Sequence, residues 1–228
     1  MLYQPPADAQ PISHLEHIVD PAHAMRVKEE AFYYMDSLEG WCTKQKASIL
    51  IDIVLKAQPM TIVEIGVWGG KSLVPMATAV RANEQGIVYG IDPWDRLASV
   101  EDMIEENNIL FWSKVDHQRV REDLIINLER FDLDYFTRIF KTSSEDAPPI
   151  HDIDVLHIDG NHSDHMSYLD VTKWVPLVRR GGWIIFDGMG WAEKGTFTTA
   201  RAVNWLSNHC NKIAEYQEDG GWGIWLKR

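Results

Sequence analysis

One short stretch constrains the fold most: an apolar run that ends in a glycine-rich turn. The run covers residues 62–65, and glycines follow at positions 66, 69 and 70. Such a run is typical of a buried strand, and the glycines let the chain turn into a helix while keeping side chains away from a ligand. Glu64 lies at the end of the strand, where a carboxylate can brace the turn or bind a polar ligand group.

A second acid follows about one strand–helix unit later. Residues 87–91 read as another buried strand, and Asp92 stands at its end. In doubly wound sheets this position binds ribose hydroxyls, so the two features together indicate a cofactor of nucleoside type.

Two phosphate-binding motifs fail on their spacing. A dinucleotide fingerprint that started at Gly66 would need glycine at Trp68 and Lys71. A P-loop ending in Gly70-Lys71-Ser72 would need its first glycine at Ile65, so the loop is one residue too short. A nucleoside without a phosphate group fits the turn better.

Four segments carry a resemblance to a known family. They are EIGVWGG from Glu64, GIDPW from Gly90, VLHIDGNH from Val155 and GGWIIFD from Gly181. In this order they resemble class I S-adenosylmethionine-dependent methyltransferases, and most closely the bacterial small-molecule O-methyltransferases of the macrocin O-methyltransferase and cephalosporin-pathway type. The resemblance spans roughly residues 60 to 190.

The pattern of apolar runs predicts an α/β fold. Strands are expected at residues 61–65, 87–91, 136–141, 153–158 and 183–187, with helices between them. This alternation predicts a mostly parallel sheet with helices on both faces. Two short strands around Gly220 and Gly221 predict a C-terminal antiparallel hairpin. The resemblance implies the same hairpin, in a Rossmann-like methyltransferase fold with a seven-stranded sheet.

The predicted organisation has two parts. Residues 1–58 form an N-terminal arm and helical cover, with helices over 24–38 and from Thr43 to Pro59, and residues 59–228 form the methyltransferase domain. Residues 93–118 are longer than an ordinary loop between a strand and a helix. We interpret them as a lid on the substrate side of the ligand crevice; an insertion that only decorates the surface is the alternative.

Composition excludes several partners. The formal net charge of −12 argues against a nucleic-acid partner, whose phosphates require a basic face. There is no apolar stretch long enough for a membrane span and no signal-peptide pattern, and the two cysteines are too few for a disulfide framework. We expect a cytoplasmic protein, and the sequence leaves open whether it forms a homo-oligomer.

The resemblance and the strand-end positions together predict the cofactor site. We expect S-adenosylmethionine to bind near the ends of four strands, at Glu64, Gly66, Val67, Trp68, Gly69, Asp92, Pro93, Trp94, Ser144, Glu145 and Asp159. Trp68 and Trp94 could face the sulfonium. Ser144 and Glu145 could contact the adenine ring; the alternative for these two residues is a solvated polar turn.

Two further acids and a histidine are candidates for catalysis. Asp159 and Asp187 both end central strands, and their carboxylates suit Mg²⁺ or another divalent cation. Metal-using relatives carry a third oxygen ligand directly after the second aspartate, where this chain has Gly188, so Asn161 or His162 would have to complete the site. The alternative is that both aspartates only position the cofactor and the substrate. Either His162 or Asp159 could accept the proton of a substrate hydroxyl.

These expectations describe an S-adenosylmethionine-dependent O-methyltransferase. The resemblance implies a hydroxyl acceptor on a small molecule, a glycosylated or aromatic natural product. Two alternatives stay open: a catalytically inactive cofactor-binding module, and a P-loop-like nucleotide hydrolase that uses the Lys71 turn.

Overall fold

The computed structural model describes residues 19–218 and 220–228. Most of the irregular arm predicted for the first twenty or so residues lies outside these ranges. The first described element is α1 (Pro21–Met35), which Asp20 begins by accepting a hydrogen bond from the backbone N–H of Ala22. It starts three residues earlier than predicted because proline is well tolerated in the first turn of a helix.

The second helix follows its predicted start. In α2 (Lys44–Ala57), the side chain of Thr43 accepts a hydrogen bond from the backbone N–H of Lys46, and Gln58 ends the helix in a left-handed conformation. The apolar stripe of α2 is buried and contains Leu50, Ile51 and Val54. One lysine, Lys46, lies in the same buried stripe.

The predicted seven-stranded sheet is confirmed. Its order is β3-β2-β1-β4-β5-β9-β8, and the strands β1 to β5 run parallel, whereas β9 is antiparallel to both β5 and β8. The bounds are β1 (Thr61–Ile65), β2 (Ile87–Asp92), β3 (Thr137–Lys141), β4 (Ile153–Ile158), β5 (Val178–Asp187), β8 (Cys210–Tyr216) and β9 (Trp222–Lys227). The chain changes direction across the sheet between β1 and β4, which is where ligands bind in open sheets of this kind.

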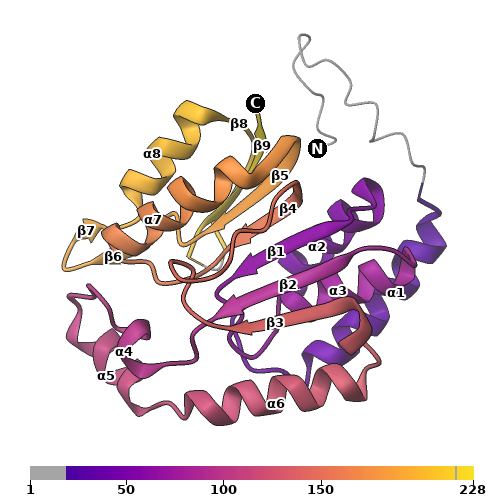
Figure 1. The fold of residues 1–228 in the computed structure, drawn as a ribbon, viewed down its shortest axis with the longest axis horizontal. Coiled ribbons are helices and arrows are strands. Elements are labelled where there is room, and N and C mark those ends of the chain that lie inside the picture. The colour runs from indigo at the N-terminus through magenta and orange to yellow at the C-terminus, as the bar shows by residue number, and fades with distance from the viewer. Residues whose placement is uncertain (1–18, 219) are drawn as a thin grey trace.

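Helices cover both faces of this sheet (Figure 1). One face carries α1, α2, α3 (Leu73–Ala82) and α6 (His117–Arg130), and the other carries α7 (Asp164–Trp174) and α8 (Ala200–His209). Neighbouring strand residues belong to opposite cores, as Ile62 and Val63 do, so both faces of the strands are apolar. Among the described residues, the model contains no helix with the length and apolar character of a membrane span.

Two segments differ from the prediction. Strand β5 begins at Val178, so Gly181 and Gly182 lie inside it, beside a register shift between Ile153 and Val155. A side chain at Gly182 would lie 2.6 Å from Val178 Cγ1, so the irregular strand requires a glycine there. A small hairpin, β6 (Ala192–Glu193) and β7 (Thr196–Phe197), was not predicted.

The insertion at 93–118 contains two short helices. These are α4 (Arg96–Ser99) and α5 (Glu106–Lys114), and they lie at the carboxyl ends of the strands with the β6–β7 hairpin (Figure 1). Short 3-10 helices complete the fold at Asp134–Phe136 and Val175–Leu177.

Gly66 lies at the end of β1, where the backbone that follows β4 packs tightly against it. Its backbone N–H donates to the carbonyl of Ile91, and the backbone N–H of Asp159 donates to the carbonyl of Ile65. A Cβ atom at Gly66 would lie 2.0 Å from the carbonyl oxygen of Asp159, and the residue has a φ of +82°. The ends of β1, β2 and β4 can therefore meet only if residue 66 has no side chain.

This close approach predicts a large difference between two glycine substitutions. We expect Gly66→Ala to lower the free energy of unfolding by more than about 3 kcal/mol, through both the clash and the left-handed backbone. Gly181 has a φ of +74° and open space around it, so Gly181→Ala should cost only about 1 kcal/mol. Urea unfolding, monitored by circular dichroism, measures the free energy of unfolding of both variants. Equal losses of this free energy would contradict the role given to Gly66.

Candidate active site

Asp92 binds the turn that follows β1. Its Oδ2 atom accepts hydrogen bonds from the backbone N–H groups of Val67 (3.0 Å) and Trp68 (2.9 Å), and Oδ1 accepts from Trp94 (2.7 Å). Burial raises the pKa of Asp92, and the three N–H groups oppose that shift. A carboxylate has about four acceptor positions, so roughly one, on Oδ1, stays available to a ligand. The residue predicted to bind ribose thus also braces the turn.

Four predicted cofactor residues are joined in this way. The Trp94 indole donates to the backbone carbonyl of Trp68 at 3.1 Å, and the Trp94 side chain is buried. Pro93 connects Asp92 to Trp94 in the chain. The structure therefore brings together Val67, Trp68, Asp92 and Trp94, and their contact with the cofactor stays a prediction.

The glycines of the turn face protein rather than open space. A Cβ atom at Gly69 would lie 2.5 Å from the carbonyl oxygen of Glu39, and one at Gly70 would lie 2.4 Å from Leu124 Cδ1. Gly66 has the same kind of contact with Asp159, so a structural need for the turn accounts for all three glycines, and their contact with a cofactor stays a prediction. Packing of the turn against its neighbours requires them, independently of any ligand.

A chain of buried charged groups lies beneath the strand ends. Lys46 Nζ lies 2.5 Å from Asp187 Oδ1, and Asp187 Oδ2 lies 2.7 Å from Nε2 of His157. The other nitrogen of His157 lies 2.7 Å from Glu64 Oε1, which also accepts a 2.5 Å hydrogen bond from the Ser72 hydroxyl. Glu64 and His157 have no exposed surface. Glu64, predicted to bind cofactor, is instead enclosed in this chain.

Each charge in this chain stabilises the next. Burial and Lys46 oppose protonation of His157, but its hydrogen bonds to Asp187 and Glu64 raise the pKa of His157 to about 9. Burial opposes the charged form of Asp187, but Lys46 and His157 hold the pKa of Asp187 below its usual value. Asp187 and Asp159 likewise raise the pKa of Lys46 against the effect of burial. Lys46, His157 and Asp187 are therefore all charged at neutral pH.

Asp159 and His162 lie at the open side of the chain. A third of the Asp159 side chain is exposed, with Oδ2 at 3.7 Å from Lys46 Nζ and Oδ1 at 3.7 Å from His162 Nε2. Desolvation and repulsion from Asp187 raise the pKa of Asp159 to about 7. Burial lowers the pKa of His162 to about 4, so its imidazole is neutral at physiological pH. Its Nε2 atom has no hydrogen-bond partner among the residues that the structure describes.

Gly188 provides the space that His162 occupies. A Cβ atom at Gly188 would lie 2.5 Å from both Cδ2 and Nε2 of His162, and Gly188 has a φ of +67°. The ring also contacts Trp191, with centroids 5.1 Å apart. The place where metal-using relatives were expected to carry a third oxygen ligand is therefore filled by an imidazole.

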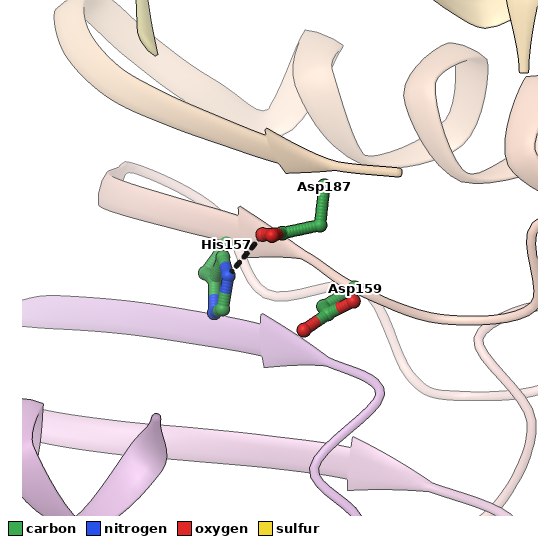
Figure 2. Close-up of side chains that lie close together, drawn as sticks. All are labelled: His157, Asp159 and Asp187. Atoms are coloured by element: carbon green, nitrogen blue, oxygen red, sulfur yellow. Dashed lines mark hydrogen bonds and ion pairs between the residues drawn. The ribbon is translucent and has the colours of Figure 1, made fainter. Parts of the chain in front are cut away.

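The predicted metal ligands do not fit a divalent ion in this arrangement. His157, Asp159 and Asp187 each offer a ligand atom within 4.8 Å of the others (Figure 2). However, both oxygens of Asp187 already face donors, Lys46 on one side and His157 on the other. The Lys46 ammonium occupies the position between Asp187 and Asp159 that a metal ion would need.

Ser144 and Glu145 are anchored to α7. The backbone carbonyl of Ser144 accepts hydrogen bonds from Lys173 Nζ (2.7 Å) and the Trp174 indole (3.1 Å), and the carbonyl of Glu145 also accepts from Lys173. Ser144 is buried, whereas Glu145 is exposed. Their predicted contact with adenine stays a prediction.

Glu193 fastens the two-helix insertion, although no sequence motif marks it for this role. Its carboxylate accepts from the backbone N–H groups of Ile104 (2.6 Å) and Glu105 (3.1 Å) and from the Asn108 amide (3.0 Å). These donors stand at the start of α5, so Glu193 caps that helix from a distant hairpin. On the other side, the amide of Asn161 donates to two carbonyls of the α4 segment.

An open aromatic cavity of about 440 Å³ lies beside the turn, between the α1–α2 loop and α5. The rings of Trp41, Trp68 and Phe111 line it, with the polar side chains of Glu39 and Lys71. Trp68 and Trp112 pack edge to face, with centroids 5.0 Å apart. Trp68 belongs to both features, because its backbone N–H binds Asp92 while its ring lines the cavity.

This fold and this arrangement of strand-end groups define a Rossmann-like α/β protein of methyltransferase type. A family model described as a methyltransferase domain matches residues 63–189, more than half of the chain. The chain therefore belongs to the methyltransferase-domain family, as the sequence resemblance predicted. A comparison with curated proteins found no match.

Solved structures share the fold. The O-methyltransferase NovP is 17% identical with a TM-score of 0.67, and the match covers 90% of this chain and 99% of NovP. The O-methyltransferase TomG from Streptomyces achromogenes, solved in complex with SAM, is 15% identical with a TM-score of 0.59, covering 93% and 92%. An O-methyltransferase from Bacillus cereus, solved in complex with SAH, is 15% identical with a TM-score of 0.60, covering 93% and 94%.

The contacts of Glu193 predict how the insertion is held. We expect Glu193→Ala to speed amide hydrogen exchange over residues 96–114, because the start of α5 loses its distant cap, which is worth about 0.5–2 kcal/mol. Glu106→Ala, at an exposed position in the same helical turn, should leave the exchange nearly unchanged. Exchange measured by mass spectrometry tests this, and identical rates in the two variants would contradict it.

Proposed function

We propose that this protein transfers the methyl group of S-adenosylmethionine to a hydroxyl of a small molecule. The observation that carries the proposal is the methyltransferase-domain match over residues 63–189, which includes the turn, Asp92, and the segment from Asp159 to His162. Structural neighbours named as O-methyltransferases, two of them solved with SAM or SAH, support this donor and this type of acceptor.

The donor would bind along the turn after β1. Asp92 keeps roughly one acceptor position on Oδ1 that can receive a ribose hydroxyl, and Trp94 stands next to it. The neighbouring carboxylate of Asp159 is the exposed acid of the buried chain, so it can face a positively charged sulfonium or the acceptor hydroxyl.

The acceptor would enter the aromatic cavity. Its volume of about 440 Å³ falls in the usual range for small-molecule sites. The rings of Trp41, Trp68 and Phe111 suit stacking on a flat aromatic ring or on the apolar face of a sugar. Glu39 and Lys71 can bind its polar groups. These features favour an aromatic or glycosylated acceptor.

The reaction needs alignment and one proton acceptor. The acceptor oxygen attacks the methyl carbon, the carbon–sulfur bond breaks, and S-adenosylhomocysteine leaves with the bonding electron pair. The hydroxyl proton passes to a base of the protein. Because the methyl group is already activated, the main task of the site is to hold donor and acceptor in line and exclude water.

Asp159 and His162 are the two candidates for this base. Asp159 is partly exposed and its pKa of about 7 is close to physiological pH, which favours proton transfer. His162 is neutral and its Nε2 atom is unpaired among the described residues, but a pKa of about 4 makes it a weak base.

Binding of S-adenosylhomocysteine tests the donor site. We expect Asp92→Ala to weaken binding at least about tenfold by calorimetry, because hydrogen bonds to a charged group are lost. Asp123→Ala, an exposed acid on α6, should leave affinity unchanged. Thermal unfolding of each variant separates loss of binding from loss of folding.

Three outcomes distinguish the proposal from its alternatives. Transfer of labelled methyl to a hydroxylated acceptor supports a methyltransferase. Tight binding of S-adenosylhomocysteine without transfer to any hydroxylated acceptor would indicate an inactive cofactor-binding module. Binding of ATP–Mg²⁺ without binding of S-adenosylhomocysteine would indicate the hydrolase.

The pH profile of transfer identifies the base. If Asp159 accepts the proton, it acts only when deprotonated, so kcat/KM should rise with pH through about 7 and then level off. A base at His162 would place that rise near pH 4 instead. Asp159→Asn should abolish the rise near pH 7, whereas His162→Gln should keep it. A rise near pH 4 that His162→Gln abolishes and Asp159→Asn keeps would assign the proton to His162.

A further inference from the structure

The position of Lys46 is unusual for its helix. It lies in the apolar stripe of α2, one turn before Leu50, and only 1% of its side chain is exposed. An ammonium group without a partner is very costly to bury, so this position is tolerable only because carboxylates surround it. The neighbouring lysine on the same helix, Lys44, is half exposed and pairs with Asp36 at the surface.

The ammonium lies between the ends of two strands. It contacts Asp187 at the end of β5 at 2.5 Å and stands 3.7 Å from Asp159 after β4. The ring of Trp222 in β9 lies 5.8 Å away and closes the site on another side. A lysine from the helical cover thus reaches the carboxyl edge of the sheet.

A divalent cation would need the same oxygens. Such an ion binds carboxylate oxygens at about 2.0–2.6 Å and prefers several oxygen ligands. Here Asp187 Oδ1 is taken by Lys46, Oδ2 faces His157, and residue 188 has no side chain to add a ligand. The remaining carboxylate, Asp159, also has its Oδ2 atom 3.7 Å from the Lys46 ammonium.

We propose that Lys46 is a tethered cation that takes the position of a divalent metal ion between Asp159 and Asp187. It neutralises the carboxylate pair and fixes Asp187 and, through it, His157. Lys46 then acts as a positioning residue for Asp159 during methyl transfer. This consequence rests on the proposed function. The enzyme then works without a bound divalent ion.

Manganese binding to the purified protein tests this directly, by electron paramagnetic resonance and calorimetry. We expect wild-type protein and Lys46→Arg, which keeps the charge, to bind no stoichiometric Mn²⁺. Lys46→Ala removes the ammonium and leaves both carboxylates, so Mn²⁺ affinity should increase on the order of tenfold or more. Adding Asp187→Asn to Lys46→Ala should abolish the gain, and Lys44→Ala should behave as wild type.

Two results would overturn the proposal. One is stoichiometric Mn²⁺ binding by wild-type protein that Asp187→Asn removes. The other is a folded Lys46→Ala variant that gains no affinity. If Lys46→Ala does not fold, Mn²⁺ binding by the wild-type protein still tests the proposal.

A chelator separates this proposal from the proposed function. Methyl transfer by the wild-type enzyme should be unchanged in EDTA, and loss of transfer that Mn²⁺ restores would contradict the tethered cation. If no transfer is found with any acceptor, the proposed function fails while the Mn²⁺ experiments still test Lys46.

Discussion

The buried ion pair of Lys46 with Asp187 is the constraint on which the rest of the site depends. It ties α2, a helix outside the sheet, to the end of β5, and His157 extends the connection to Glu64 in β1. Removing one partner from such a pair leaves an uncompensated charge and typically costs about 3–5 kcal/mol. The predicted boundary at residue 58 therefore separates two segments of sequence that share one buried network. The helical cover is part of the site.

This network explains which groups can meet a substrate. Glu64, His157, Lys46 and Asp187 are at most 4% exposed, whereas a third of the Asp159 side chain is exposed. The enclosed groups can set the charge and orientation of their neighbours but cannot contact an acceptor. On the other side of the β1 end, Asp92 holds the turn that would receive the donor, and its neighbour Trp68 reaches the aromatic cavity. Close packing of Gly66 against Asp159 joins the buried network to the turn that Asp92 holds.

Much of this arrangement was predictable because it depends on local pattern. Apolar runs gave the parallel strands, and the rule that parallel strands end at one edge placed Glu64, Asp92, Asp159 and Asp187 there together. The prediction was weaker where contacts between distant parts of the sequence decide the structure. Strand β5 extends through two glycines because β4 is irregular beside it, and the insertion divides into α4 and α5, with a residue 88 positions away capping α5. No local signal marks Glu193. The role of Lys46 has a local signal, because it is a lysine in the apolar stripe of α2.

The order of apolar and glycine residues is enough to predict the class of fold, the edge of the sheet that carries the site, and the acids that stand there, because strand and turn formation follow from that order. What those acids bind depends instead on contacts between elements that are far apart in the sequence. Asp187 meets Lys46 across 141 positions of sequence, and Gly188 makes room for His162 rather than leaving a ligand position vacant. A charge buried in the interior must find a partner in space, and the packing of distant helices against the sheet selects that partner.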